Sequence, residues 1–138
     1  SYMGTLGYGF PTALGVKAGH PDTPVLALVG DGGFMYAIGE MATAVQYNIN
    51  LVTVVFNNHR FGASNDDQRN RFKGNVIGTE LHNPNFVALA ESFGVMGIKV
   101  TELDRFPGAM RDAVAAGRPV LIDVDGDAAQ AMARPVRL

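Results

Sequence analysis

The stretch "ALVGDGGF" at residues 27–34 decides the fold predicted for this chain. It completes the apolar run at residues 25–29 and then places Asp31 among three glycines. A carboxylate is costly to bury in an apolar core, so its position is better explained by the end of a buried strand. A charge at such a point needs a partner, and glycines let a ligand come close to the backbone.

Three further apolar runs, at residues 51–56, 97–100 and 120–124, also have strand character. Such runs are typical of strands buried on both faces of a parallel sheet. Helical patterns alternate with the runs, at residues 11–18, at 34–47, at 86–93 and around Met110, Ala113 and Val114. The third helix is expected to be opened by Asn83-Pro84, as cap and first turn, and closed by Gly94. The alternation predicts an α/β fold with an open, mainly parallel sheet and helices on both faces, a three-layer sandwich.

The composition fits a single globular domain over residues 1–138. The chain has 47% hydrophobic and 17% charged residues, a net charge of −2 and no cysteine. Scattered Lys and Arg residues leave no electrostatic footprint for nucleic acid, and no apolar run reaches the roughly 20 residues of a membrane helix. The lack of cysteine excludes a disulfide scaffold and predicts a cytoplasmic protein. The start at Ser1, without an initiator Met, predicts that the domain is part of a longer protein.

Residues 59–81 interrupt the alternation of strands and helices. The segment is polar, mixed in charge and without a clear period. Connections longer than about 12–15 residues are uncommon unless they are functional or disordered. Two interpretations remain: a surface excursion, or a loop that closes over a site. The second is favoured because the segment starts at the carboxyl end of a strand, where open α/β sheets bind ligands.

Asp31 lies at the same edge of the predicted sheet, and a helix is expected to start within two or three residues of it. Free N–H groups at a helix start attract an anion, whereas a carboxylate repels one unless a cation lies between them. Asn57 and Asn58 end the next predicted strand and add amide oxygens at this edge. Carboxylate, amide and phosphate oxygens suit Mg²⁺. The alternative is a helix-capping Asp beside ordinary turn residues.

The spacing of these residues resembles the motif of thiamine-diphosphate-dependent enzymes. Gly30-Asp31-Gly32, 24 further residues and then Asn57-Asn58 match the family's Gly-Asp-Gly and Asn-Asn elements. Three other segments resemble acetolactate-synthase-like members: GTLGYGFP at residues 4–11, EMATAVQYN at residues 40–48 and NPNFVALAESFG at residues 83–94. The resemblance covers nearly the whole chain. It implies the thiamine-diphosphate-binding fold and the C-terminal, diphosphate-binding domain of a longer enzyme.

The resemblance also implies a role for each matching residue. Asp31 and Asn58 would bind Mg²⁺ through their side chains, and Arg60 through its backbone carbonyl. Gly4 would offer its carbonyl to the aminopyrimidine ring, and Leu6 would be the apolar wedge under the bent cofactor, with an ordinary core leucine as the alternative. The other implied cofactor contacts are Thr5, Gly30, Gly32, Gly33, Phe34, Phe61 and Gly62, with the backbone around residues 32–34 holding the diphosphate.

The implied cofactor, thiamine diphosphate, stabilises the carbanion left when a 2-oxo acid loses carbon dioxide. In the family, a glutamate from a different domain activates the pyrimidine ring. The glutamates of this chain do not match that motif: Glu40, Glu80, Glu91 and Glu102. No catalytic residue is therefore expected here, and the chain alone should be inactive.

The resemblance implies several partners. They are a 2-oxo acid substrate and a pyrimidine-binding domain, on the same protein or on a partner subunit of a homodimer or homotetramer. The reaction would be decarboxylation or carboligation, in the lyase or transferase class. A second function class remains open: a non-catalytic phosphate- or nucleotide-binding α/β module. The presence of both Asp31 and Asn58 favours the enzyme domain.

Overall fold

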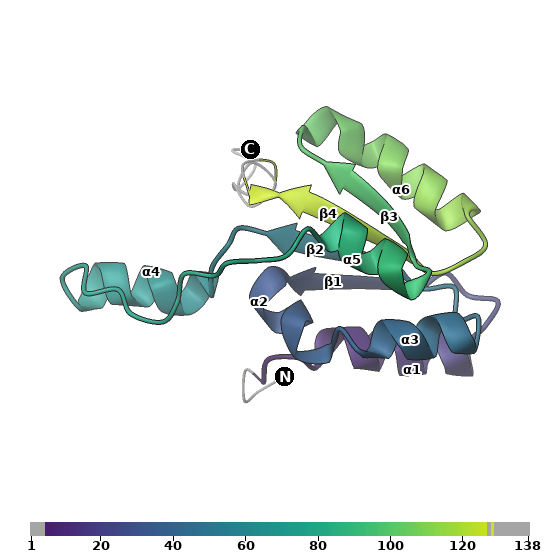
Figure 1. Cartoon of the computed structure of the whole chain (residues 1–138), viewed down its shortest axis with the longest axis horizontal. Helices are drawn as coiled ribbons and strands as arrows, with labels where there is room; N and C mark the ends of the chain where they lie inside the picture. Colours follow the sequence, from purple (N-terminus) through teal and green to yellow (C-terminus); the bar gives the residue numbers. More distant parts are fainter. Residues whose placement is uncertain (1–4, 127, 129–138) are drawn as a thin grey trace, which may run out of the picture.

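The computed structural model describes residues 5–126 and 128, and its centre is a four-stranded parallel sheet (Figure 1). The strands lie in the order β1-β2-β4-β3. Their bounds are β1 Leu26–Gly30, β2 Val52–Asn57, β3 Met96–Val100 and β4 Val120–Asp125. The predicted strands are confirmed to within one residue at each end. Because all four run in parallel, their carboxyl ends meet at one edge of the sheet.

Helices cover both faces of the sheet, which confirms the predicted α/β sandwich. The helices are α1 (Gly9–Gly19), α2 (Asp31–Phe34), α3 (Glu40–Gln46), α4 (Gly62–Arg71), α5 (Phe86–Phe93) and α6 (Phe106–Ala115), with 3-10 turns η1 (Met35–Ala37) and η2 (Leu103–Arg105). Helices α1, α2, α3 and α5 share one core, and α6 packs on the other face. None of the helices in the described residues has the length and apolar character to cross a membrane.

An aromatic stack fixes the position of the turn after β1. The Phe34 ring is fully buried between Phe10 of α1 and Phe86 of α5. Its centroid lies 5.2 Å from that of Phe10 and 5.8 Å from that of Phe86, both in edge-to-face geometry. Such pairs add about 0.5–1.5 kcal/mol beyond the area that they bury. The residues just before Phe34 are therefore held on a rigid base.

Two predictions about burial and helix continuity are wrong. β1 is not buried on both faces within the described residues, because α6 covers β3 and β4 and leaves Leu28 64% exposed. The continuous helix expected at residues 34–47 is broken: α2 is followed by a 3-10 turn, and α3 starts only after Gly39. Glycine lowers helix propensity by about 1 kcal/mol relative to alanine, which favours a break there.

Helix α5 spans the predicted residues, but its N-cap lies two residues later than expected. The Asn85 side chain accepts a hydrogen bond from the backbone N–H of Ala88 at 3.1 Å, so Asn85 is the N-cap. Gly94 ends the helix in the left-handed conformation, with φ 87°, as predicted. Pro84 disfavours the helical conformation at the residue before it, which keeps Asn83 outside the helix. The Asn83 side chain is thereby available for contacts elsewhere.

Candidate functional site

The ends of β1 and β2 bring two buried polar residues together. Gly30 pairs with Phe56 in the sheet, so Asp31 and Asn57 lie at neighbouring strand ends. Asp31 is 1% exposed and Asn57 is 3% exposed. Helix α2 begins at Asp31 itself, directly after the strand, which confirms the predicted early helix start.

Each oxygen of the Asp31 carboxylate accepts one hydrogen bond from a neutral group. The backbone N–H of Gly32 donates to Oδ1 at 2.9 Å, and the side-chain amide of Asn83 donates to Oδ2 at 2.7 Å. The same Asn83 nitrogen donates to Oδ1 of Asn57 at 2.8 Å. Within the described residues, no Lys, Arg or His forms an ion pair with Asp31. Its charge therefore has hydrogen-bond partners but no counter-charge in this part of the chain.

Two glycines allow other segments of the chain to pack close to the turn after Asp31. A Cβ atom at Gly32 would lie 2.5 Å from the Phe61 ring and 3.1 Å from Cδ1 of Leu81. On the other side, Gly7 has φ 79°, and a Cβ atom there would lie 2.7 Å from Cβ of Tyr36. The chain segment with Thr5 and Leu6 therefore runs close to the turn after Asp31. Gly4 lies outside the described residues.

The other predicted metal ligands follow Asn57 directly. The Asn58 side-chain oxygen accepts a hydrogen bond from the backbone N–H of Arg60 at 3.3 Å. Arg60 pairs with Glu80 in an antiparallel bridge. Gly62 begins α4, and a Cβ atom there would lie 3.4 Å from Nδ2 of Asn58. The predicted ligands Asp31 and Asn58 thus lie at neighbouring strand ends, with Arg60 at the start of the next segment.

We call residues 59–81 the arm, since it projects from the body of the domain (Figure 1). The segment was expected to be a surface excursion or a loop over the site, and it contains a helix, α4, that the sequence did not predict. The arm closes on itself at its root, where the Phe61 N–H donates to the Thr79 carbonyl at 2.9 Å and the Leu81 N–H donates to the His59 carbonyl at 2.7 Å. The root also packs on Gly32, so the arm starts at the site.

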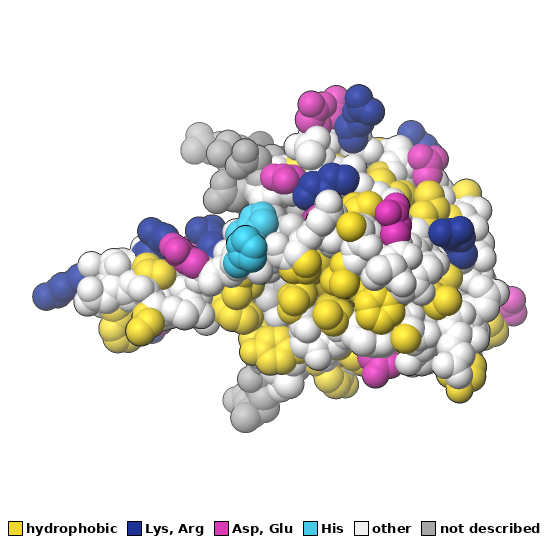
Figure 2. Space-filling model, in the orientation of Figure 1, with side chains coloured by type: hydrophobic (Ala, Val, Ile, Leu, Met, Phe, Trp, Pro, Cys, Tyr) yellow, Lys and Arg dark blue, Asp and Glu magenta, His cyan; other side chains and the backbone are white. Residues whose placement is uncertain are grey.

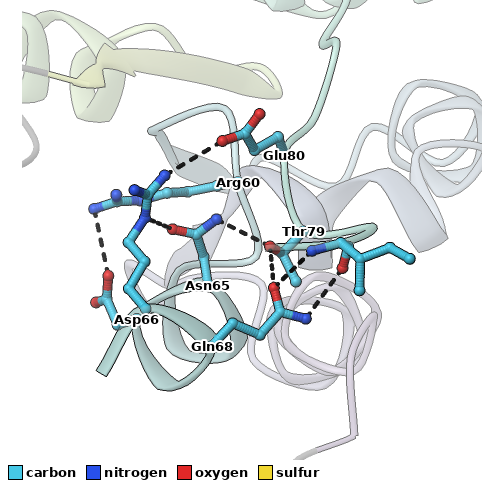
Figure 3. Close-up of polar contacts among 8 residues, drawn as sticks. Arg60, Asn65, Asp66, Gln68, Thr79 and Glu80 are labelled. Atoms are coloured by element: carbon cyan, nitrogen blue, oxygen red, sulfur yellow. Dashed lines mark hydrogen bonds and ion pairs between the residues drawn. The ribbon is translucent and has the colours of Figure 1, made fainter. Parts of the chain in front are cut away.

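Polar side chains hold the arm together (Figure 3). The Asn65 amide is fully buried; it donates to the Thr79 hydroxyl at 2.9 Å and accepts from Arg69 at 2.8 Å. The Thr79 hydroxyl donates to Gln68 at 2.9 Å, and Arg69 lies 3.3 Å from Glu80. Because this helix is stabilised by polar contacts, its sequence lacks the apolar period that predicts most helices.

The comparisons with known proteins agree with this geometry. The family described as "Thiamine pyrophosphate enzyme, C-terminal TPP binding domain" matches residues 1–124. The chain belongs to this family. As such a TPP-binding domain, it is 37% identical to the acetolactate synthase large subunit of Haemophilus influenzae, over 90% of this chain and 22% of that protein. It is 32% identical to pyruvate oxidase of Lactiplantibacillus plantarum, over 89% of this chain and 21% of that protein.

A solved structure has the same fold as this TPP-binding domain. It is the thiamine diphosphate-dependent 4-hydroxybenzoylformate decarboxylase of Rhodococcus jostii RHA1, with a TM-score of 0.82 and 37% identity. The match covers 87% of this chain and 23% of that chain. The TPP-binding domain thus spans about a fifth of the length of the curated relatives that it matches.

The donor set of this TPP-binding domain fits a small divalent cation. Within the described residues, no group of three or more His, Asp or Glu side chains could hold a metal. A cation at Asp31 would therefore need amide, carbonyl or ligand oxygens as well. Mg²⁺ has this preference, since it usually binds through one or two carboxylates together with phosphate groups and water. A buried carboxylate without a counter-charge is costly, and a cation would remove that cost.

The contacts of Asn83 at this site were not predicted. Asn83 was expected to cap the following helix, whereas the structure places its amide between Asp31 and Asn57. These contacts span 52 and 26 residues of sequence. The one available signal was the Asn-Pro pair, which argues against a helical residue at position 83.

Proposed function

We propose that this domain binds thiamine diphosphate through Mg²⁺ and forms the diphosphate-binding half of the active site of a 2-oxo acid decarboxylase or carboligase of the acetolactate-synthase-like kind. The observation that carries the proposal is Asp31. Its carboxylate is almost fully buried at the end of a strand, and the described residues around it supply only neutral donors. A bound cation would supply the missing counter-charge and attract a diphosphate to the same point.

The residues have distinct tasks in this proposal. The side chains of Asp31 and Asn58 and the carbonyl of Arg60 bind the cation, and the backbone of Gly32, Gly33 and Phe34 holds the diphosphate. Leu6, which is 50% exposed, offers an apolar surface to the thiazolium ring. Support comes from the buried aromatic stack at Phe34, which keeps the backbone of this turn in place. Rigid placement of this kind is how a protein contributes to cofactor chemistry.

The second half of the site is proposed to come from another domain. Thiamine diphosphate, when bound, supplies carbanion stabilisation, but none of the glutamates of the chain lies among the residues assigned to its site. Apolar side chains also remain exposed beside the site, Tyr36 at 66% and Tyr8 at 60%. Figure 2 shows hydrophobic side chains gathered beside α2, near the start of the chain. Exposed apolar patches commonly mark interfaces, which supports a pyrimidine-binding domain on the same protein or on a partner subunit of a cytoplasmic homodimer or homotetramer.

Calorimetry tests the cofactor assignment directly. Thiamine diphosphate is titrated into the domain with saturating Mg²⁺ and with a chelator, and ATP and NAD are titrated in the same two conditions. We expect binding of thiamine diphosphate that requires the cation, and no comparable binding of ATP or NAD. Preference for a nucleotide would instead support a non-catalytic nucleotide-binding module.

An activity assay tests the divided site. The isolated chain, saturated with Mg²⁺ and thiamine diphosphate, is incubated with a panel of 2-oxo acids and the release of carbon dioxide is followed. We expect no turnover, because one side of the cofactor stays open to water and the activating glutamate is missing. Robust turnover by a monomer would contradict the divided site while leaving cofactor binding intact.

A further inference from the structure

Asn83 joins three segments of the chain at one nitrogen atom. It lies in the loop before α5, and its Nδ2 donates to Oδ2 of Asp31 at 2.7 Å and to Oδ1 of Asn57 at 2.8 Å. Since an ionised carboxylate only accepts hydrogen bonds, the group that faces Asp31 must be the nitrogen of the amide. Both amide hydrogens are then in use, and the orientation of the side chain is fixed.

The contact fixes the Asp31 carboxylate without neutralising it. One oxygen is held by the Gly32 N–H and the other by Asn83, so the carboxylate cannot rotate without breaking a hydrogen bond. Each carboxylate oxygen accepts more than one hydrogen bond or ligand, so both keep a lone pair for a cation. A lysine in place of Asn83 would also hold the carboxylate. Its positive charge, however, would neutralise the carboxylate and compete with the cation.

We propose that Asn83 is a positioning residue for the metal site: its amide holds the Asp31 carboxylate in the orientation that binds the cation, and anchors it to Asn57 at the end of the neighbouring strand. The inference rests on the proposed function. Partners that orient a metal ligand contribute strongly to affinity, and their loss typically weakens metal binding by about 10- to 100-fold.

Asn85 is a matched control two residues along the same loop. Its side chain accepts a hydrogen bond from the Ala88 N–H at 3.1 Å, and that bond caps α5 and does not involve Asp31. Asn85→Ala therefore removes a hydrogen bond from the same segment and should lower stability as a lost cap does. It should leave the orientation of Asp31 unchanged.

The experiment compares the wild-type chain, Asn83→Ala and Asn85→Ala. The affinity for Mn²⁺ in the presence of saturating thiamine diphosphate is measured by electron paramagnetic resonance, and the melting temperature without ligand by circular dichroism. We expect Asn83→Ala to weaken Mn²⁺ binding by about 10- to 100-fold, and Asn85→Ala to change it less than about twofold while lowering the melting temperature. A purely structural role for Asn83 would lower the melting temperature and leave Mn²⁺ affinity unchanged.

Two outcomes would overturn the inference in different ways. Wild-type affinity in a folded Asn83→Ala variant would remove the positioning role and leave the proposed function standing. Failure of the wild-type chain to bind Mn²⁺ and thiamine diphosphate would remove both. Should Asn83→Ala not fold, nuclear magnetic resonance of the wild-type chain decides: the Asn83 side-chain amide signals should shift on saturation with Mg²⁺ and thiamine diphosphate, and unmoved signals would overturn the inference.

Discussion

Two aspartates, Asp31 and Asp123, are buried near the carboxyl edge of the same sheet, and the groups around them differ. Asp123 on β4 is 2% exposed, and its Oδ2 lies 2.9 Å from the Lys99 ammonium of the neighbouring strand β3. Asp31 is equally buried, but the described residues hold it only by the neutral amides of Gly32 and Asn83. Among the described residues, the charge of Asp123 thus has a counter-charge and that of Asp31 has none.

The difference separates a structural carboxylate from a binding carboxylate. A buried charge is tolerated when a partner compensates it, and removal of one partner leaves a large penalty. For Asp123 the chain supplies the partner, since Lys99 pairs with it and, at 3.3 Å, with Asp125. For Asp31 the described residues supply none, and a bound cation would. The comparison therefore supports the proposed cation site at Asp31 and gives no reason for one at Asp123.

The largest expected effect comes from exchanging the two carboxylates for amides, one at a time. Asp31→Asn keeps the shape but removes the charge, so we expect cation-dependent binding of thiamine diphosphate to weaken by more than about 100-fold, beyond the effect typical of residues that only orient a ligand. Without ligand, the free energy of unfolding should change little, because removal of the buried charge offsets the hydrogen bond that the new NH2 group cannot accept from Gly32 or Asn83. Calorimetry and urea unfolding measure the two quantities.

Asp123→Asn is the control for that variant. It should leave thiamine diphosphate affinity within about twofold of wild type and lower stability, because Lys99 loses its nearest charged partner. Equal cofactor affinity in wild type and Asp31→Asn would show that Asp31, like Asp123, does not take part in cofactor binding.

Lys99→Met is expected to have the next largest effect, on stability alone. It leaves Asp123 buried without a counter-charge, which costs about 3–5 kcal/mol for a fully buried pair. Because the Lys99 side chain is 39% exposed, we expect a smaller loss of about 2 kcal/mol in urea unfolding. Asp125→Asn, which removes only the more exposed partner, should cost less than about 1 kcal/mol. A Lys99→Met variant as stable as wild type would show that Asp123 does not need its partner.

The sequence predicted the sheet because its strands carry the information locally. Continuous β-branched runs such as residues 51–56 and 120–124 identify buried parallel strands without knowledge of their neighbours. Helix α4 could not be predicted in this way. It is polar on all sides and depends on contacts such as Asn65 with Thr79, fourteen residues apart, so no local period marks it. The exposure of Leu28 on β1 could not be predicted from the sequence either, since it depends on which strands α6 covers.

At the candidate site, the residues at the strand ends could be predicted from the sequence, but the hydrogen bonds that Asn83 makes with them could not. Asp31, Asn57 and Asn58 follow apolar runs, and parallel strands bring their ends to one edge. Asn83 comes from a loop far along the chain, and the sequence placed it at a helix cap that belongs to Asn85. The prediction of a cap failed by two residues, which was enough to hide a contact with Asp31.

The arm provides a way to sharpen the comparison, because its root lies against the turn that follows Asp31. Its root packs on Gly32 through Phe61 and Leu81, so an ordered ligand at Asp31 should also order the root. We expect hydrogen exchange of residues 59–62 and 79–81 to slow by about tenfold with Mg²⁺ and thiamine diphosphate, as local opening becomes rarer. β3, which carries Lys99, serves as the internal control and should change little. Equal exchange rates in the arm with and without ligand would show that the arm is not ordered by a ligand at Asp31.

The smallest expected effect is the pH dependence of the Lys99 contact. Burial lowers the pKa of Lys99, but the hydrogen bonds and negative charges of Asp123 and Asp125 outweigh burial and raise the pKa above its ordinary value of 10.5. A cationic group with a raised pKa stabilises the folded state fully below the unfolded-state pKa and loses that contribution as the pH rises through the folded-state pKa. The stability difference between wild type and Lys99→Met, measured by urea unfolding, should therefore be constant near neutral pH and shrink above about pH 10.5.

Lys99→Arg keeps its charge across this range, so its stability should not fall in the same window. A difference between wild type and Lys99→Met that stays constant to high pH would mean that packing of the lysine stem, and not its charge, supports Asp123.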